Sequence, residues 1–354
     1  MRHKLARALV VPTGAWLAAT VTVLATAAAR GYAPFDPSTW KRWDSGLYIW
    51  IAQDGYAVSQ CPTGWCGNAG WFPGYPWAIR AAHAVGPSWV AAGVVISWAA
   101  GLGALVLIWN TFLGRRHTAA SIGAVLFAAF APGAVYEYAV FPLALLACFT
   151  VGFLWFLYRG RWLAAGVAGA AATFTYPTAV ALIAVALAWA LVERRTAIQS
   201  LLAGALSACG LGLVLYDLHH DTGRWNAYFL VQRKYHHHLH SPLAAFQHGV
   251  AHPATAIGAQ SLLVTVALAC VLVSLVLRRP RVERAELLVA VWTLATWLLA
   301  NIESGVSIYR AEATLLPAAI LVRRLPVPVV YGLVALAAGV LVWMTGLFLN
   351  LTLL

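Results

Sequence analysis

The sequence predicts an all-α membrane protein, built as a polytopic bundle of transmembrane helices. Of its 354 residues 62% are hydrophobic and only 10% are charged, and the mean hydropathy is +0.77. Because a soluble domain carries about 25% charged residues, most of this chain must lie in lipid. Backbone in lipid has to satisfy its own hydrogen bonds, which leaves helices or a closed barrel. Long unbroken apolar runs favour helices.

The apolar runs predict about eleven spans in one domain that covers residues 1–354. The first, at about 8–29, follows a basic start and could be a signal peptide. Its apolar length suits a retained first helix better. The count is approximate because some runs fall short of the ~20 residues that a perpendicular helix needs. The further runs are 88–109, 118–135, 140–158, 162–174, 178–192, 198–216, 256–277, 287–300, 311–322 and 328–349.

The basic residues predict the orientation of these spans. The net charge is +12, and 15 of the 23 Lys and Arg residues fall in the N-terminus and in short turns that alternate threading puts on one side. Cytoplasmic loops of membrane proteins carry such an excess, so topology explains the charge and no nucleic-acid partner is needed. We therefore expect a multi-pass cell-membrane protein with a cytoplasmic N-terminus. Its long outer loops are 30–87 and 217–255, and both are expected to carry short interfacial helices.

The five cysteines fall into two groups. Cys148, Cys209 and Cys270 lie in apolar runs, where a free thiol is usually inert. Cys61 and Cys66 flank a Pro-Thr-Gly-Trp turn in the first outer loop. An oxidising exterior favours a disulfide between them, and two free thiols are the alternative. A zinc site is disfavoured because no second pair of ligands lies nearby.

The first outer loop holds the longest polar, acid-bearing and aromatic stretch of the chain, from Trp43 to Tyr75. Asp44 follows Trp43 and precedes Ser45-Gly46. A carboxylate at the lipid boundary, flanked by aromatic rings, suits general base catalysis. The alternative is that Asp44 caps the N-terminus of an interfacial helix. Asp54, before Gly55, is more simply a turn former.

The spacing of this loop resembles a known family. The pattern Trp43-Asp44-Ser45-Gly46-x-Tyr48, then Ile51-Ala52-x-x-Gly55-Tyr56, then Phe72-Pro73-x-Tyr75-Pro76 is similar to the first outer loop of the PIG-V-like mannosyltransferases, which have the GT-C fold. Weaker features follow in the family's order over residues 40–320. They are Glu137 between two tyrosines, Arg159-Gly160-Arg161-Trp162, Thr175-x-Pro177-Thr178, and Tyr309-Arg310.

The resemblance implies an inverting glycosyltransferase on the extracytoplasmic face. Its donor would be a polyprenyl-phosphate-linked sugar, with mannose the first expectation, and its acceptor a lipid or glycan. In such an enzyme Asp44 would be the base and Glu137 a second acid, while cationic side chains would stabilise the departing phosphate. Expected substrate-binding residues are Trp43, Tyr48, Tyr75, Tyr176, Arg233, Lys234, Tyr309 and Arg310.

Two features qualify the cationic candidates. Tyr176 stands where many relatives have Arg before the central Pro, so another residue must bind phosphate here or the donor differs. Arg80 and Lys234 are as well explained as snorkelling anchors, whereas Arg310 lies in a short loop beside Tyr309, where a charge at membrane depth is costly unless useful.

Histidines are the one feature that suggests a metal. The stretch His236-His237-His238-x-His240, with His219-His220-Asp221 upstream, lacks a clean ligand spacing. We expect these residues to border the acceptor groove, and we expect no metal and no cofactor.

Two other functions compete with transfer chemistry. A transporter or lipid flippase would place ionisable residues at mid-membrane, whereas the predicted span centres hold almost none. A non-catalytic membrane scaffold would leave Asp44 without a chemical role. Membrane lipids are expected partners, and the sequence sets no oligomeric state.

Overall fold

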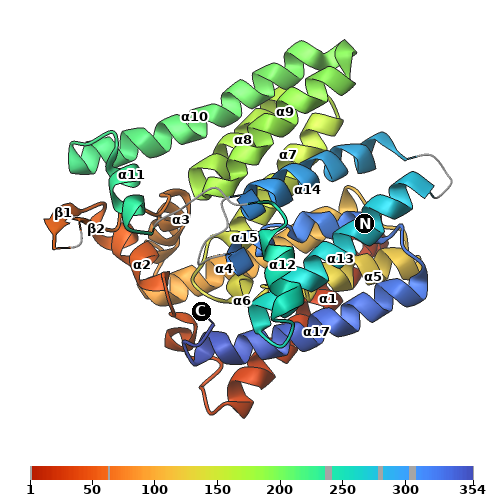
Figure 1. The fold of residues 1–354 in the computed structure, drawn as a ribbon, viewed down its shortest axis with the longest axis horizontal. Coiled ribbons are helices and arrows are strands. Elements are labelled where there is room, and N and C mark those ends of the chain that lie inside the picture. The colour runs from red at the N-terminus through yellow and green to blue at the C-terminus, as the bar shows by residue number, and fades with distance from the viewer. Residues whose placement is uncertain (1, 63, 236–240, 278–281, 303–307, 354) are drawn as a thin grey trace.

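The computed structural model describes residues 2–62, 64–235, 241–277, 282–302 and 308–353, and nearly all of them are helical (Figure 1). Long helices lie side by side as a bundle, and shorter ones gather at one end around α2 and α3. The helices are α1 (Arg2–Ala29), α2 (Ser45–Asp54), α3 (Gly74–His83), α4 (Trp89–Asn110), α5 (Ala119–Ala129), α6 (Val135–Tyr138), α7 (Leu143–Tyr158), α8 (Trp162–Thr175), α9 (Ala181–Val192), α10 (Ala197–Thr222), α11 (Ala227–Gln232), α12 (Ala244–Ala251), α13 (Ala256–Leu277), α14 (Arg284–Ile302), α15 (Ile308–Ala313), α16 (Ala319–Val322) and α17 (Val327–Leu349).

Six helices in the described part are long and apolar enough to cross a bilayer, and four shorter apolar helices accompany them. The six lie within α1, α4, α10, α13, α14 and α17. The prediction of a continuous span over 311–322 is wrong. There α15 ends at Ala313 and a 3-10 turn, η5 (Leu316–Ala318), precedes α16. Pro317 is the second residue of that turn, and it lacks the N–H that a continuing helix would need.

Small residues let the helices of the bundle approach closely. A Cβ added at Gly169 of α8 would come within 1.9 Å of Ser207 Oγ, and one at Gly210 of α10 within 2.1 Å of the carbonyl oxygen of Ala170. Neither position tolerates a side chain, so α8 and α10 pack backbone against backbone, as small residues allow in membranes.

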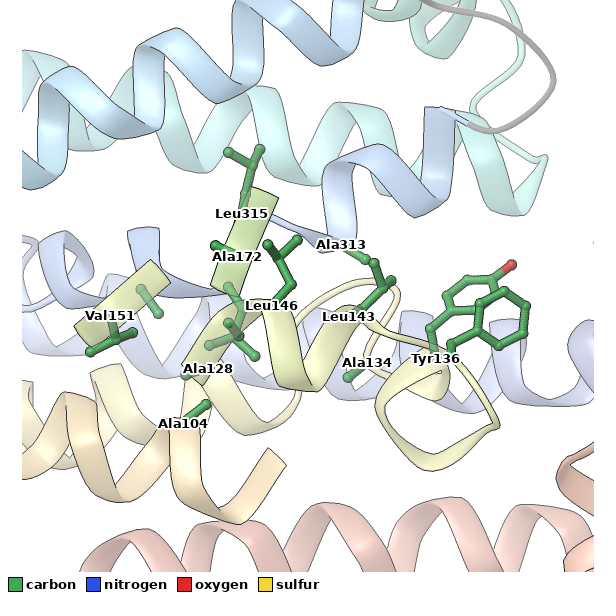
Figure 2. Packing of buried hydrophobic residues seen from close by; sticks show 14 of the residues in the cluster. Ala104, Ala128, Ala134, Tyr136, Leu143, Leu146, Val151, Ala172, Ala313 and Leu315 are labelled. Carbon is green, nitrogen blue, oxygen red and sulfur yellow. The ribbon is translucent and has the colours of Figure 1, made fainter. Parts of the chain in front are cut away.

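The centre of the molecule is an apolar core formed by helices far apart in the sequence. Figure 2 shows Leu143 and Leu146 of α7 beside Ala313 and Leu315, with Ala172 of α8 next to them. All five side chains are buried. The segment after α15 is thus fixed against the middle of the chain, and α15 itself packs against α13 and α14 (Figure 1).

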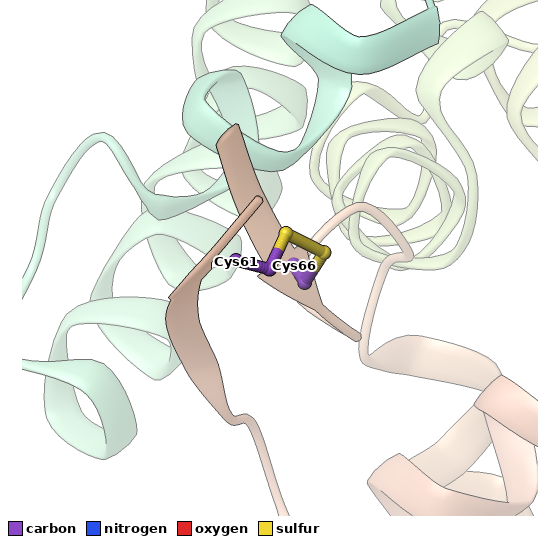
Figure 3. The surroundings of a disulfide bond; sticks show 2 residues. All are labelled: Cys61 and Cys66. Atoms are coloured by element: carbon purple, nitrogen blue, oxygen red, sulfur yellow. A yellow bond between two sulfur atoms is a disulfide. The ribbon is translucent and has the colours of Figure 1, made fainter. Parts of the chain in front are cut away.

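The first outer loop folds into short elements that rest on the bundle. A 3-10 turn, η1 (Pro37–Trp40), leads to α2, and an antiparallel hairpin of β1 (Val58–Cys61) and β2 (Gly64–Gly67) separates α2 from α3. Cys61 and Cys66 form a disulfide across this hairpin (Figure 3). The hairpin itself was not expected from the sequence.

Side-chain hydrogen bonds fasten this loop in place. Arg80 of α3 donates to the carbonyl oxygens of Ala52 (2.9 Å) and Ile51 (3.2 Å), and so satisfies the C-terminal end of α2. The backbone N–H of Tyr56 donates to Asp221 Oδ2 at 2.9 Å, which ties the loop to α10. A Cβ at Gly55 would lie 2.6 Å from the same oxygen, so only glycine permits this approach.

Helix α10 extends beyond the predicted apolar run 198–216. It continues to Thr222, within the stretch that we predicted as the second long outer loop, and ends at Gly223, which has φ 67°. The segment that follows packs against the first loop, where Gln232 Nε2 donates to the carbonyl oxygen of Gly70 at 2.8 Å.

An ion-pair network fastens the opposite end of the bundle. Glu286 at the start of α14 is 2% exposed and receives hydrogen bonds from Arg323 and Arg324, which follow α16. Glu283 pairs with Arg323 at 3.2 Å but is more than half exposed. This network joins α14 to the end of α16.

Candidate active site

Asp44 stands at the N-cap position of α2, but its side chain does not cap the helix. Its carboxylate forms an ion pair with the guanidinium of Arg310 on α15. The two side chains are 24% and 18% exposed. Asp44 therefore lies at the start of the helix, as the capping alternative predicted. Its carboxylate, however, pairs with Arg310, which lies 266 positions later in the chain.

Trp43, immediately before Asp44, has an unusual backbone. Its φ is 54°, in the left-handed region that residues other than glycine rarely adopt. Such a conformation costs about 1–3 kcal/mol and tends to occur at functional sites. The ring packs against the core, and its Nε1 is buried with no hydrogen-bond partner among the described residues. An N–H donor therefore lies one residue from the carboxylate.

Tyr48, one turn along α2 from Asp44, lies at the centre of this group. The residue is 2% exposed, and its ring meets Tyr75 edge-on at 5.6 Å and Phe141 at 5.8 Å. Burial raises the pKa of Tyr48 well above its ordinary value, and Tyr176 and Asp44 raise it further. Its hydroxyl therefore stays protonated and can donate a hydrogen bond, and Asp44 remains the basic group.

Four of the other residues that the sequence nominated lie around Tyr48. Asp44, Arg310, Tyr75 and Tyr176 all lie near enough to influence its ionisation. Tyr75 is fully buried, and its hydroxyl contacts the carbonyl oxygen of Gly93 (2.8 Å) and Ser97 Oγ (2.7 Å). Tyr75 is thus engaged in packing α3 onto α4. Tyr176 is half-buried at the start of η2 (Pro177–Val180).

Arg310 is the third residue of the short helix α15 and lies in its first turn. Tyr309 precedes it on the same helix, and the side chain of Tyr309 is outside what the structure describes. The late motif and the first outer loop thus meet at the ion pair, although the sequence places them more than 250 residues apart.

Arg233 and Lys234 lie elsewhere. Both belong to the 3-10 turn η4 (Arg233–Tyr235), which packs against α11 and the hairpin strand β2. Arg233 is exposed, and the Lys234 ammonium lies 5.0 Å from the centre of the Tyr235 ring. No contact within the described part of the chain joins either residue to Asp44.

Glu137 is also apart from the Asp44 group. Its carboxylate lies in the bundle, where a Cβ added at Gly101 of α4 would be 3.5 Å from Glu137 Oε2 and 3.8 Å from Trp16 Nε1. The acidic turn is therefore inserted between α1 and α4. The structure brings Glu137 to these helices and not to the first outer loop.

A polar pocket lies at the other end of α2. It has a volume of 340 Å³ and is lined by both acids and bases, including Asp54, Arg80, Asp217 and Asp221. Within the described ranges no group of three His, Cys, Asp or Glu residues could hold a metal ion. The stretch His236 to His240 lies outside the described residues, and His219 stacks on Trp225 at 4.2 Å.

Comparison with known proteins identifies the type of fold. No family profile matches the sequence, and no curated protein matches it. Among solved structures the chain is similar to ArnT from Cupriavidus metallidurans bound to undecaprenyl phosphate, with 17% identity and a TM-score of 0.56. The match covers 90% of this chain and 61% of ArnT, so the chain spans about three-fifths of that protein's length. The expected GT-C type membrane fold is confirmed.

Proposed function

We propose that this protein is an integral-membrane inverting glycosyltransferase. It moves a sugar from a polyprenyl-phosphate donor to a lipid or glycan acceptor on the extracytoplasmic face of the cell membrane. Asp44 is the general base and Arg310 binds the donor phosphate. The observation that carries the proposal is the ion pair between these two residues, formed at the end of a bundle with the fold of ArnT.

Three lines of support favour this donor. The similar structure of ArnT has undecaprenyl phosphate bound, which favours a polyprenyl-phosphate carrier here. A guanidinium near the membrane boundary matches a phosphate, because its N–H groups can pair with two phosphate oxygens. The resemblance of the first outer loop to PIG-V-like enzymes makes mannose the first sugar to test.

The chemistry follows from these groups. The Asp44 carboxylate takes the proton of an acceptor hydroxyl, whose oxygen forms a bond to the anomeric carbon of the donor. The bond from that carbon to the phosphate oxygen breaks at the same time, and the lipid phosphate leaves with the electron pair. Attack from the face opposite the leaving group inverts the configuration. Positive charge at Arg310 stabilises the dianionic product.

The ion pair gives Asp44 and Arg310 linked tasks. Arg310 orients the carboxylate of Asp44 before substrate arrives. An incoming phosphate competes for the same guanidinium, so donor binding loosens the pair and exposes the base where the acceptor must react. Trp43 Nε1 and the Tyr48 hydroxyl are the nearby neutral donors available to sugar or phosphate oxygens.

The test compares two aspartates of one helix. Membranes containing wild type, Asp44→Asn or Asp54→Asn are supplied with labelled polyprenyl-phosphate mannose, and transfer to lipid and glycan fractions is measured. We expect Asp44→Asn to lower transfer about 10²–10⁴-fold, the usual contribution of a general base. Asp54→Asn, at the exposed end of α2, should retain it. Equal transfer by wild type and Asp44→Asn would exclude the assigned base.

The same assay addresses the competing functions. A transporter or flippase would move labelled lipid between leaflets without forming a glycosidic product, and a scaffold would do neither. If mannose is inert, other polyprenyl-phosphate sugars are tried in the same membranes before the class of reaction is rejected. Release of free sugar alone, sensitive to Asp44→Asn, would show that water replaces the acceptor.

A further inference from the structure

A narrow apolar groove lies on the far side of α15 from Asp44. Its walls come from α5, α13, α14 and the segment from α15 to α16, with Val264 and Leu268 of α13 facing Leu316. Its volume is 60 Å³, far below the 300–1,000 Å³ of pockets for drug-sized ligands. Such a space suits part of one hydrocarbon chain and excludes a ring-shaped head group.

One acidic side chain, that of Glu312, lines this otherwise apolar groove. Glu312 is 2% exposed, and Gln260 Nε2 of α13 donates to its Oε2 at 3.0 Å. The other oxygen, Oε1, is buried and has no hydrogen bond within the described residues. Ser261 faces the same carboxyl group, at a geometry that gives neither group a regular hydrogen bond. A buried polar atom without a hydrogen bond lowers the stability of the folded protein by about 1–3 kcal/mol.

Further unsatisfied polar atoms lie on α14, which packs against α15. Thr293 lines the groove, and Thr296 and Trp297 follow on the same face of that helix, three and four residues later. Thr296 Oγ1 and Trp297 Nε1 are buried without a partner in the described part of the chain. Of these three residues only Thr293 lines the groove, so the groove offers an acceptor at Glu312 Oε1 and a hydroxyl group at Thr293.

The charge of the lining restricts the ligand. No Lys, Arg or His is among the residues that line the groove, and Glu312 is its one ionisable group. A phosphate would meet a carboxyl group with no cation to offset it. An alcohol both donates and accepts hydrogen bonds, so it matches the mixed set of atoms. Because residues two apart on a helix face opposite sides, Glu312 and the phosphate-binding Arg310 serve different ligands.

We propose that this groove is a second lipid site, which binds one chain of a membrane lipid with an uncharged alcohol head group. The chain lies along the aliphatic wall of α13, and the hydroxyl bonds to Glu312 Oε1 and to the Thr293 hydroxyl group of α14. This site lies beyond the proposed transferase reaction and does not depend on it.

The test uses the full-length protein in nanodiscs with two photoreactive probes of identical chains. One is a diacylglycerol, which ends in a hydroxyl, and the other is a phosphatidic acid. We expect the diacylglycerol probe to label peptides from α13 and from α15 to α16, and unlabelled diacylglycerol to compete. Equal or stronger labelling by the phosphatidic acid would overturn the alcohol assignment.

Variants locate the label. Ala267→Phe fills the groove and should reduce labelling about tenfold or more, as expected from excluding roughly two methylene groups. Val266→Phe, on the exposed side of the same helix (47% exposed), is the matched control and should label like wild type. Unchanged labelling in Ala267→Phe would overturn the site and leave a cavity that holds only water.

The head-group contact is tested separately. Glu312→Leu removes the carboxyl group and should reduce labelling, whereas Glu312→Gln keeps hydrogen-bonding capacity and should label more strongly than Glu312→Leu. Equal labelling by the two variants would contradict a hydroxyl bound at this position. The Asp44→Asn variant should be labelled by the probe to the same extent as wild type. A failed transfer assay and a failed labelling experiment can therefore be told apart.

Discussion

At the scale of single residues, the pairing of Asp44 with Arg310 is the feature to explain. A purely structural pair is insensitive to which partner carries which charge, whereas a base and a phosphate ligand cannot exchange roles. Because both side chains are partly exposed, their ion pair stabilises the fold by only about 0–1 kcal/mol. Activity and stability should therefore respond differently when the charges are changed.

The double variant Asp44→Arg/Arg310→Asp tests this distinction. We expect it to melt within a few degrees of wild type, since the ion pair can re-form, and to remain inactive in sugar transfer. The single variants Asp44→Asn and Arg310→Gln should also be inactive, and Arg310→Lys should keep partial activity with a raised KM for the donor. Melting temperature and transfer rate are measured on the same preparations. Recovery of transfer in the double variant would assign the pair a structural role only.

The raised pKa of Tyr48 leads to a prediction for alkaline conditions. The unfolded side chain titrates at about pH 10, and burial keeps the folded one protonated above that value. Its contribution to stability is therefore fully present below about pH 10 and is lost as the pH rises further. Tyr48→Phe should narrow the difference in melting temperature between about pH 9 and pH 11 relative to wild type. An unchanged difference would mean that other tyrosines dominate the alkaline loss.

At the scale of elements, the network around Glu286 holds α14 against the end of α16. Glu286 is 2% exposed and pairs with two arginines. The carboxyl of Glu286 raises the pKa of Arg324, to which it is hydrogen-bonded. Replacing Glu286 by Gln removes the buried carboxylate that both arginines share and leaves Arg323 with only the exposed Glu283. Breaking a buried pair in this way costs about 3–5 kcal/mol.

Glu283 supplies the matched control for that prediction. It contacts Arg323 but is 53% exposed, so Glu283→Gln should cost only about 0–1 kcal/mol. Thermal unfolding in detergent compares the two variants. Similar melting temperatures for Glu286→Gln and Glu283→Gln would show that the buried carboxylate contributes no more than the exposed one.

The elements also show what the sequence could and could not predict. The long helices follow from apolar runs, and Asp44 could be nominated as a site residue because its loop motif is local. The groove around Glu312 was missed, since Gln260 and Glu312 lie 52 residues apart within apolar surroundings and no spacing rule connects them. Glu137 was expected as a second acid beside Asp44 because of the family resemblance, but the turn that carries it enters the bundle.

At the scale of the whole molecule, orientation is the open prediction that matters most. The disulfide of Cys61 and Cys66 fits an oxidising exterior, and the basic turns fit a cytoplasmic interior. In a background without other reactive thiols, a cysteine at Ser59 should react with a membrane-impermeant reagent added to intact cells. A cysteine at Arg161 should react only after the cells are opened. Both positions are exposed, and the reverse pattern would invert the topology.

The distance along the chain between Asp44 and Arg310 has a consequence for biosynthesis. The ribosome delivers the aspartate early and the arginine only after most helices have been inserted. A partly translated chain thus carries the proposed base without the proposed phosphate-binding arginine, and is not expected to act on the carrier lipids around it. Chemistry would begin only once assembly in the bilayer is nearly complete.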